Sequence, residues 1–280
     1  MKVLVTGANG QLGYDVVKEL QKQNIECYGA TRKDFDITDF RSTYTFIINY
    51  MPDAVIHCAA YTAVDKAEDE QGLCHLVNTS ATENIAEICK KINAKLLYIS
   101  TDYVFNGRKD GFYEVDDETN PINVYGKSKL LGEKAVQKIL KKYFIVRISW
   151  VFGKHGNNFV KTMMRLGKEL KEINVVSDQY GSPTYTADLS SLLVEMIKTE
   201  KYGIYHATNE GVCSWAEFAE EIFKIAKMDV NVNYITTAEY RTRAKRPLNS
   251  KLSKKRIKEN FYELPNWKSS LQTFIKNLNF

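Results

Sequence analysis

The glycine-rich stretch near the N-terminus constrains the fold most strongly. Residues 3–6, Val-Leu-Val-Thr, form a short apolar run typical of a strand buried on both faces. Gly7, Gly10 and Gly13 follow, and a helical pattern of apolar residues continues over 16–20. Glycines at this spacing permit a tight turn, let the backbone approach a pyrophosphate and let the helix pack on the strand. The sequence therefore predicts a dinucleotide-binding turn.

Strand and helix patterns alternate through the first half of the chain. Apolar runs that we interpret as further strands cover residues 25–30, 54–60, 96–100 and 144–150, with a long helix over 73–92. This alternation predicts an α/β fold with a Rossmann-type doubly wound parallel sheet. We expect an NAD(P)-binding domain over residues 1–150. Residues 151–280 should form a smaller, mainly helical substrate-binding lobe with segments that return to the sheet.

The alternation becomes less regular beyond residue 150. We expect helices over 159–170, 188–198, 214–227 and 267–278, and strands over 173–177, 202–208 and 230–235. Ser214 and Glu217 match a capping box at the start of a helix. Asp188 is expected to be the N-cap of its helix.

Composition and charge pattern exclude several classes of function. The 280-residue chain has a formal net charge of +5, and its lysines are spread along the sequence, which favours a solvated surface over a nucleic-acid patch. No apolar run approaches the ~20 residues of a membrane helix, and the sequence starts directly in a strand. Five cysteines without a Cys-x-x-Cys pair and four scattered histidines indicate reduced thiols and no metal site. We therefore expect a cytoplasmic protein that binds neither nucleic acid nor membranes.

Tyr125 and Lys129 are the strongest candidates for catalysis. They lie four residues apart in a helical pattern and so share one face. A phenol has a pKa near ~10, and a neighbouring ammonium group lowers it, which makes the phenol a usable general acid. Thr101 follows a predicted strand, at the edge where parallel sheets place their sites. These side chains predict carbonyl reduction, with hydride from a nicotinamide and a proton from the phenol. Tyr14 and Lys18 have the same spacing without this context, and we interpret them as helix surface.

The end of the second predicted strand leaves the choice of cofactor open. A strict NAD binder carries an acidic residue there to hold the ribose, and the nearest acids are Asp34 and Asp36. Arg32 and Lys33 could instead meet the 2′-phosphate of NADPH. Both NADH and NADPH are therefore retained.

Longer strings spread over nearly the whole chain are more specific. They are residues 59–68 (AAYTAVDKAE), 101–105 (TDYVF), 123–129 (NVYGKSK), 147–152 (RISWVF), 156–159 (GNNF), 178–184 (DQYGSPT) and 246–252 (RPLNSKL). Together with the N-terminal glycines, they resemble the extended short-chain dehydrogenase/reductase family. Within that family they are similar to the dTDP-4-dehydrorhamnose reductases.

This resemblance implies a reaction and a set of site residues. The reaction is reduction of the C4 ketone of dTDP-4-dehydro-L-rhamnose to dTDP-L-rhamnose with NADH or NADPH. Tyr125 would donate the proton, Lys129 would lower its pKa and hold the nicotinamide ribose, and Thr101 would bind the sugar. The matching cofactor-binding positions, which add to Gly7, Gly13 and Arg32, are Gly10, Gln11, Leu12, Asp36, Ile37, Ala59, Ala60 and Tyr61.

The substrate side of the expected site is smaller. Asp102 and Trp150 match substrate-contacting positions of these reductases, and Asn158 lies in one of the shared strings. A nucleotide-sugar diphosphate also needs cations. Arg246 is the first candidate for that role, with Lys161 behind it.

Other functions within the same fold stay open. Tyr103 stands where sugar-nucleotide dehydratases carry Glu, which disfavours water elimination. Some of these reductases form magnesium-bridged dimers through a glutamate on the first helix; this chain has Asp15 there, so we expect no metal and either a monomer or a homodimer. One alternative is a non-catalytic, cofactor-binding regulatory subunit. Another is an epimerase or a reductase of a different nucleotide sugar. The complete set of Thr101, Tyr125 and Lys129 favours an enzyme.

Overall fold

The computed structural model describes residues 1–278, and its centre is a six-stranded sheet. The strand order is β10-β5-β4-β3-β1-β2, and all neighbouring strands run parallel. The strands are β1 (Lys2–Thr6), β2 (Glu26–Ala30), β3 (Ala54–His57), β4 (Lys95–Thr101), β5 (Tyr143–Ile148) and β10 (Gly203–His206). Because every strand points the same way, all the carboxyl ends meet at one edge of the sheet.

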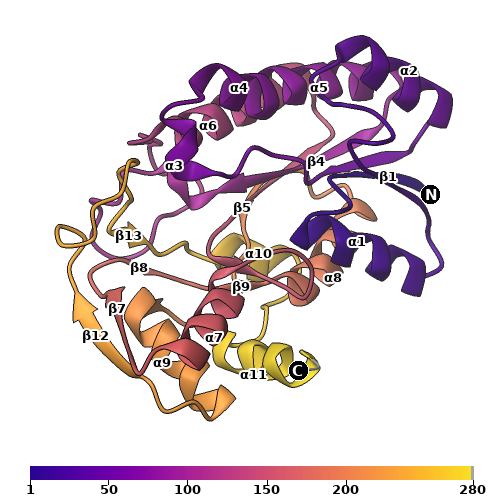
Figure 1. Cartoon of the computed structure of the whole chain (residues 1–280). Helices are drawn as coiled ribbons and strands as arrows, with labels where there is room; N and C mark the ends of the chain where they lie inside the picture. Colours follow the sequence, from indigo (N-terminus) through magenta and orange to yellow (C-terminus); the bar gives the residue numbers. More distant parts are fainter. Residues whose placement is uncertain (279–280) are drawn as a thin grey trace.

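Helices cover both faces of this sheet (Figure 1). One face carries α1 (Gln11–Lys22) and α8 (Thr186–Ile197), and the other carries α2 (Phe40–Tyr50), α5 (Ala81–Lys91) and α6 (Val124–Ile139). Successive strand residues point to opposite faces, so Val3 and Val5 pack in the core with α1 and α8, whereas Leu4 packs with the other three helices. The predicted Rossmann-type doubly wound sheet is confirmed.

The helix expected over residues 73–92 has an irregular middle. It consists of α4 (Gln71–His75), a π-helical segment η1 (Leu76–Ser80) and α5, preceded by the short α3 (Val64–Ala67). Asn78 in the π segment is buried, and its side chain accepts from the backbone N–H of Tyr61 at 2.8 Å and donates to Ser128 Oγ at 2.9 Å. The wider turn thus brings a polar side chain inward to join the end of β3 to α6.

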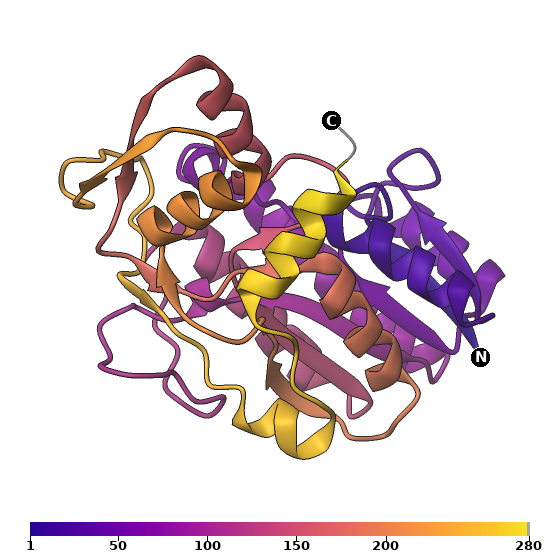
Figure 2. The ribbon, with the colours of Figure 1, turned by 90° about the horizontal axis from the view of Figure 1, so that it is seen from below.

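A second group of elements packs beside the carboxyl edge of the sheet (Figure 2). Three helices, α7 (Phe159–Glu169), α9 (Trp215–Ala226) and α11 (Trp267–Asn277), share a core with Phe152 and with the strand β7 (Glu172–Val176). The remaining elements are η2 (Asp102–Val104), β6 (Val151–Phe152), β8 (Tyr180–Gly181), β9 (Thr184–Tyr185), β11 (Cys213–Ser214), β12 (Asn231–Ile235), β13 (Asn249–Ser250) and α10 (Lys255–Asn260). The capping box of Ser214 and Glu217 is present at the start of α9.

The prediction that Asp188 caps its helix is wrong. The helix α8 begins earlier, at Thr186, and Asp188 lies in its first turn. Its carboxylate accepts hydrogen bonds from Asn209 at 2.7 Å and from Ser270 on α11 at 2.5 Å. Asp188 therefore joins two segments that are distant in the sequence.

Segments from the second half of the chain also complete the sheet. β10 pairs with β5, and α8 packs in the core beside α1. The division of the chain at residue 150 stays a prediction. No helix among the described residues is long and apolar enough to cross a membrane.

Candidate active site

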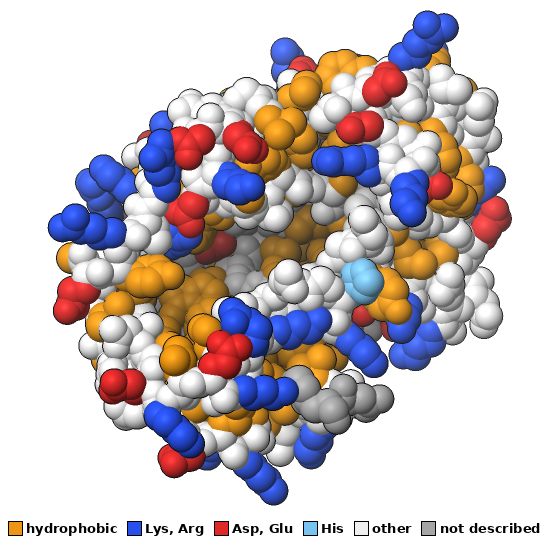
Figure 3. Space-filling view, viewed as in Figure 1, with side chains coloured by type: hydrophobic (Ala, Val, Ile, Leu, Met, Phe, Trp, Pro, Cys, Tyr) orange, Lys and Arg blue, Asp and Glu red, His pale blue; other side chains and the backbone are white. Residues whose placement is uncertain are grey.

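A cavity of about 890 Å³ lies along the carboxyl edge of the sheet, and Figure 3 shows this hollow between the two groups of elements. Most site residues predicted from the sequence line it. They are Gly7, Gly10, Gln11, Leu12, Gly13, Arg32, Asp36, Ile37, Ala59, Ala60, Thr101, Asp102, Tyr125, Lys129, Trp150 and Asn158. One cavity thus collects side chains from both halves of the chain.

The glycine turn at one end of the cavity fits a pyrophosphate. Gly7 has a φ of +68°, and a Cβ there would lie 2.7 Å from the backbone nitrogen of Ala59. A Cβ on Gly13 would lie 2.3 Å from the carbonyl oxygen of Gly7. The N-cap of α1 is Gly10, which provides no side-chain hydrogen bond to the helix. Backbone N–H groups and the positive end of the helix dipole therefore face the cavity, as an anionic group requires.

A loop from the second half of the chain reaches this end of the cavity. Asn158 caps α7 by accepting from the backbone N–H of Lys161 at 3.1 Å, and its amide donates to the Gln11 side chain at 3.0 Å. In the same loop, the His155 ring stacks on Tyr14 of α1 with centroids 4.4 Å apart. Tyr14, interpreted from the sequence as helix surface, thus holds this loop beside the glycine turn.

Arg32 and Asp36 lie where the adenosine ribose of a dinucleotide would be expected. The Arg32 guanidinium is exposed, with Nε 3.8 Å from a carboxylate oxygen of Asp36. Hydrogen bonds from the hydroxyl and backbone N–H of Thr38 hold the pKa of Asp36 below its usual value. A carboxylate and an exposed cation lie side by side, and this arrangement is compatible with either cofactor.

Thr101, Tyr125 and Lys129 meet at the centre of the cavity. Thr101 is the last residue of β4, and the other two lie on α6, whose N-cap Asn123 accepts from the backbone N–H of Gly126 at 2.7 Å. The Thr101 hydroxyl acts on the Tyr125 phenol by lowering its pKa. The sequence spacing therefore brings a hydroxyl, a phenol and an amine into one cavity.

The pKa values of this group differ from the simple expectation. The sequence suggested that Lys129 lowers the pKa of Tyr125. In the structure, burial raises the pKa of Tyr125 above its usual value, and the Thr101 hydroxyl opposes this rise. Lys129 is only 2% exposed, with Nζ 3.9 Å from the centre of the Tyr98 ring. Burial lowers its pKa to about 7, against the attraction of Glu133. Tyr125 is consequently protonated at neutral pH, which is the state that a proton donor needs.

Asp102 is the most unusual acid in the cavity. It is 3% exposed, and its Oδ1 accepts a hydrogen bond from the Thr101 hydroxyl at 2.9 Å. Its Oδ2 is buried without a hydrogen-bond partner among the described residues. Burial raises the pKa of this carboxyl to about 6, although the Ser250 hydroxyl acts in the opposite direction.

The far wall of the cavity is aromatic. Trp150 has a φ of +50° and stacks on Trp215 with ring centroids 3.7 Å apart. Gly181 makes room for this arrangement, because a Cβ there would lie 2.8 Å from the Trp150 ring. Sequence reasoning missed Trp215, whose only signal was its place at the start of a capped helix.

Comparisons with known proteins decide the family. All of residues 1–280 match the model of a family described as RmlD substrate binding domain. The chain belongs to this family. A dTDP-4-dehydrorhamnose reductase of Aggregatibacter actinomycetemcomitans is 41% identical, over 99% of this chain and 98% of its own. The spore coat polysaccharide biosynthesis protein SpsK of Bacillus subtilis is 40% identical over 98% and 97%.

Solved structures agree with this assignment. The crystal structure of a dTDP-4-dehydrorhamnose reductase from Bacillus anthracis, in complex with NADP, is similar with a TM-score of 0.96 and 45% identity. The similarity covers 98% of both chains. The resemblance found in the sequence is therefore confirmed.

Two predicted ligands of the diphosphate are engaged elsewhere in this RmlD-family chain. Arg246 does not line the cavity; it forms a double hydrogen bond with the carboxylate of Asp65, at 3.0 and 2.6 Å. The ammonium of Lys161 donates to the carbonyl oxygens of Lys154 and Gly156, at 2.6 and 2.7 Å. Both cations therefore have structural contacts that sequence reasoning could not foresee.

Tyr61 and Asp15 also have local partners. The Tyr61 hydroxyl donates to Glu70 at 2.6 Å, and Tyr61 does not line the cavity. The Asp15 carboxylate accepts from the Thr186 hydroxyl. No group of three or more His, Cys, Asp or Glu side chains that could hold a metal occurs within residues 1–278.

Proposed function

We propose that this chain reduces the C4 ketone of dTDP-4-dehydro-L-rhamnose to dTDP-L-rhamnose, with NADPH or NADH as the reductant. The observation that carries the proposal is the meeting of Thr101, Tyr125 and Lys129 in a cavity that also contains the glycine turn. The names of the similar RmlD-family proteins support the same substrate. The reaction belongs to the biosynthesis of dTDP-rhamnose.

Different residues on the cofactor side of the cavity would bind different parts of the cofactor. When bound, a reduced nicotinamide supplies the hydride. Gly7, Gly10 and Gly13 would hold the pyrophosphate, because their backbone leaves room for it at the start of α1. Arg32 would contact a 2′-phosphate if one is present, and Asp36 the ribose. The NADP of the Bacillus anthracis enzyme is consistent with this arrangement.

The reacting oxygen of the sugar would lie between Thr101 and Tyr125. Thr101 would orient the carbonyl oxygen by a hydrogen bond, and Tyr125 would donate its proton as negative charge develops there. The raised pKa of Tyr125 keeps that proton in place until the carbonyl is reduced. Lys129, which is buried at the same cavity, would favour the phenolate that remains.

The aromatic wall supports the substrate side of the proposal. Trp150 and Trp215 offer a stacked apolar surface at the cavity. A nucleotide base or a deoxysugar could pack against such a surface. Asp102 is buried near Thr101 and would face the sugar hydroxyls. The roles of Arg246 and Lys161 as ligands of the diphosphate stay predictions.

The alternatives have less support. A regulatory subunit does not require a complete set of Thr101, Tyr125 and Lys129, whereas all three line the cavity here. An epimerase from Thermus thermophilus shares the fold at 18% identity, which says nothing about the reaction. We also propose, from the sequence alone, a cytoplasmic location and either a monomer or a homodimer.

Cofactor oxidation tests the proposal. Purified protein is mixed with dTDP-4-dehydrorhamnose and either NADPH or NADH, and loss of the absorbance of the reduced nicotinamide is followed. Oxidation that depends on the sugar and yields dTDP-rhamnose is expected. Binding of the cofactor without any oxidation would favour the regulatory subunit, and oxidation with another nucleotide sugar alone would reassign the substrate.

A further inference from the structure

We propose that Asp102 returns a proton to Tyr125, through the Thr101 hydroxyl, after each turnover. This inference rests on the proposed function, in which Tyr125 loses its proton to the sugar. A phenolate left behind must be protonated again before the next reduction. The three side chains line the same cavity, and Thr101 is in contact with the buried carboxyl group.

The path starts at a hydrogen bond. The Thr101 hydroxyl donates to Asp102 Oδ1 at 2.9 Å. The same hydroxyl acts on the Tyr125 phenol, which lines the same cavity, and opposes the rise of its pKa. Thr101 is 5% exposed, at the junction of β4 and η2, so its hydroxyl is held between the two groups. A hydroxyl can accept one proton while it donates another, as a relay requires.

The surroundings of the second carboxyl oxygen of Asp102 favour the protonated form of this side chain. Asp102 Oδ2 is buried and has no hydrogen-bond partner in the described part of the chain, which is costly for a carboxylate and much less so for a carboxylic acid. Asp102 also lines the cavity. Water in the cavity can therefore supply the proton that the carboxyl passes on.

The neighbours of Asp102 do not compete for this role. The phenols of Tyr103 and Tyr125 are the titratable groups on which Asp102 acts, and Arg246 and Asp65 also act on Tyr103. Burial raises the pKa of Tyr103, so its phenol stays protonated at neutral pH. Burial also raises the pKa of Asp102 to about 6, which keeps a fraction of the carboxyl protonated near neutral pH.

The transfer balances without any other reactant. With the proton on Oδ1, the oxygen that contacts Thr101, the O–H bond of Asp102 breaks as this proton bonds to Thr101 Oγ1. The O–H bond of Thr101 breaks at the same time, and that proton bonds to the Tyr125 phenolate. Thr101 is unchanged, Tyr125 is neutral, and Asp102 is left as a carboxylate that takes a proton from water. No electrons are transferred in this step.

Asp102→Asn tests the relay by separating the first turnover from later ones. The variant starts with Tyr125 protonated, so rapid mixing of its cofactor complex with the sugar should give a burst of oxidation stoichiometric with active sites. The following steady rate should fall by roughly 10²-fold, whereas wild type should show no burst. The matched control Asp116→Asn, which removes an exposed acid from the neighbouring loop, should behave as wild type.

The other outcomes are equally informative. If Asp102 only shapes the site, the burst and the steady rate of Asp102→Asn will slow together, and the relay is wrong. If neither phase changes, Asp102 has no part in proton return. Absence of oxidation in wild type would instead contradict the proposed function.

A second variant tests the relay through the pKa of Asp102 itself. The Ser250 hydroxyl lowers that pKa, so Ser250→Ala should raise it and shift the alkaline limb of kcat to higher pH. Infrared titration gives a readout without turnover: a carboxylic acid band that is absent in Asp102→Asn should titrate at higher pH in Ser250→Ala. A band that titrates at higher pH while the kcat profile stays unchanged would overturn the proposal.

Discussion

At the residue scale, burial controls the chemistry of the candidate site more than charge pairing does. Burial favours the neutral phenol of Tyr125 and the neutral amine of Lys129. The pKa of Lys129 is lowered to about 7. A buried amine with a lowered pKa shifts a neighbouring phenol less than a full positive charge would. The site is therefore arranged to keep a proton on Tyr125 until substrate reduction requires it.

Tyr125→Phe should fold and bind the cofactor normally but lose most of its turnover. Removal of the phenol oxygen takes away the proton donor, so kcat should fall by roughly 10²- to 10⁴-fold. Cofactor affinity, measured by fluorescence titration, should stay within about twofold of wild type, which is a change below about 0.5 kcal/mol. Tyr143→Phe, at the start of β5 and far from the carboxyl edge, is the control. Near-normal turnover of Tyr125→Phe would assign the proton to another group.

Lys129 should make stability depend on pH. Its pKa falls from 10.5 to about 7 on folding, so the unfolded chain binds more protons between these values. The free energy of unfolding should therefore rise with pH across this range, by at most about 1.4 kcal/mol per pH unit. Lys129→Met should lack this rise in urea unfolding at about pH 7 and about pH 9.

The control for this measurement is Lys127→Met. Lys127 is exposed on the same helix, so the variant should keep the pH dependence of wild type. An identical dependence in wild type and Lys129→Met would mean that Lys129 is charged in the folded protein throughout this range.

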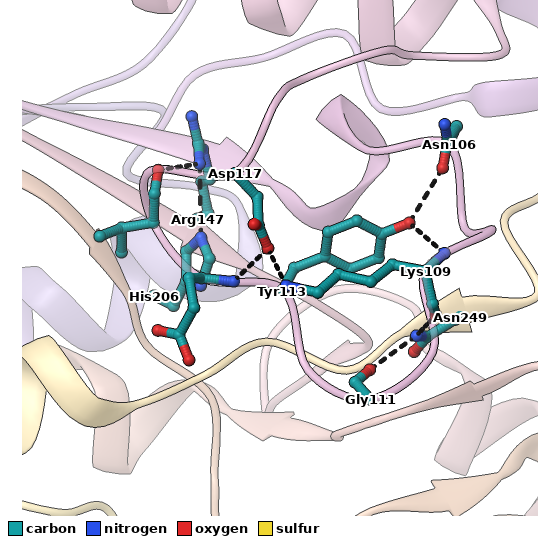
Figure 4. A network of polar contacts seen from close by, with 10 residues as sticks. Asn106, Lys109, Gly111, Tyr113, Asp117, Arg147, His206 and Asn249 are labelled. Carbon is teal, nitrogen blue, oxygen red and sulfur yellow. Dashed lines mark hydrogen bonds and ion pairs between the residues drawn. The ribbon is translucent and has the colours of Figure 1, made fainter.

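At the element scale, the segment 243–252 packs against the loop 105–113 that follows η2. Asn249 donates to the carbonyl oxygens of Lys109 and Gly111, at 2.6 and 2.8 Å (Figure 4). The backbone N–H of Tyr113 donates to the Lys251 carbonyl at 2.8 Å. Leu252 packs with Phe105 and Tyr113. The string at 246–252, recognised in the sequence as a family feature, thus holds the loop that follows Asp102.

The ion pair of Arg246 with Asp65 should stabilise this segment modestly. Both hydrogen bonds are well formed, but the Asp65 side chain is 45% exposed, so solvent screens the interaction. A double-mutant cycle with Arg246→Met and Asp65→Asn should give a coupling of about 0.5–1 kcal/mol in urea unfolding.

A neighbouring ion pair provides the matched control. Arg243 contacts Asp69 from the same segment, with side chains 65% and 53% exposed. The equivalent cycle should give a coupling close to zero. Equal couplings for the two pairs would show that the bidentate geometry of Arg246 adds nothing.

The buried ion pair of Arg147 with Glu133 should be far more sensitive. It joins β5 to α6 beneath the site, with contacts of 2.8 and 3.0 Å and side chains 3% and 1% exposed. Arg147 also reaches His206 at 3.4 Å (Figure 4). Arg147→Met leaves Glu133 buried and unpaired, so unfolding in urea should show a loss of about 3–5 kcal/mol.

Arg165→Met is the control for that loss. Its partner Glu169 lies one turn away on the surface of α7, at 3.6 Å. The change in stability should be below about 0.5 kcal/mol. A similarly small effect of Arg147→Met would mean that Glu133 takes up a proton or water at little cost.

At the scale of the whole molecule, sequence reasoning succeeded where periodicity and turn chemistry decide the structure. The apolar runs and the glycine turn predicted the parallel sheet, because buried strands and tight turns leave local signals. The spacing of Tyr125 and Lys129, with Thr101 at a strand end, predicted which side chains meet in the cavity. These features depend on near neighbours along the chain.

Contacts between distant segments carried no such signal. The sequence predicted Arg246 as a cation for the diphosphate. Its partner in the structure is Asp65, which lies far away in the sequence and comes close only in the folded chain. The sequence predicted Asp188 as an N-cap. Its carboxylate instead accepts hydrogen bonds from Asn209 and Ser270. The stacking of Trp150 on Trp215 and the position of Ser250 beside Asp102 likewise required the three-dimensional structure.

Transfer of a deuterium label tests the central claim most directly. The protein is incubated with dTDP-4-dehydrorhamnose and NADPH, or NADH, that carries deuterium at the transferring position of the nicotinamide, and the nucleotide sugar is analysed by mass spectrometry and NMR. We expect dTDP-rhamnose with one deuterium, located at C4, in wild type and almost none in Tyr125→Phe. Recovery of unlabelled or unchanged sugar, with cofactor bound, would contradict the assignment of this cavity as the active site of a ketoreductase.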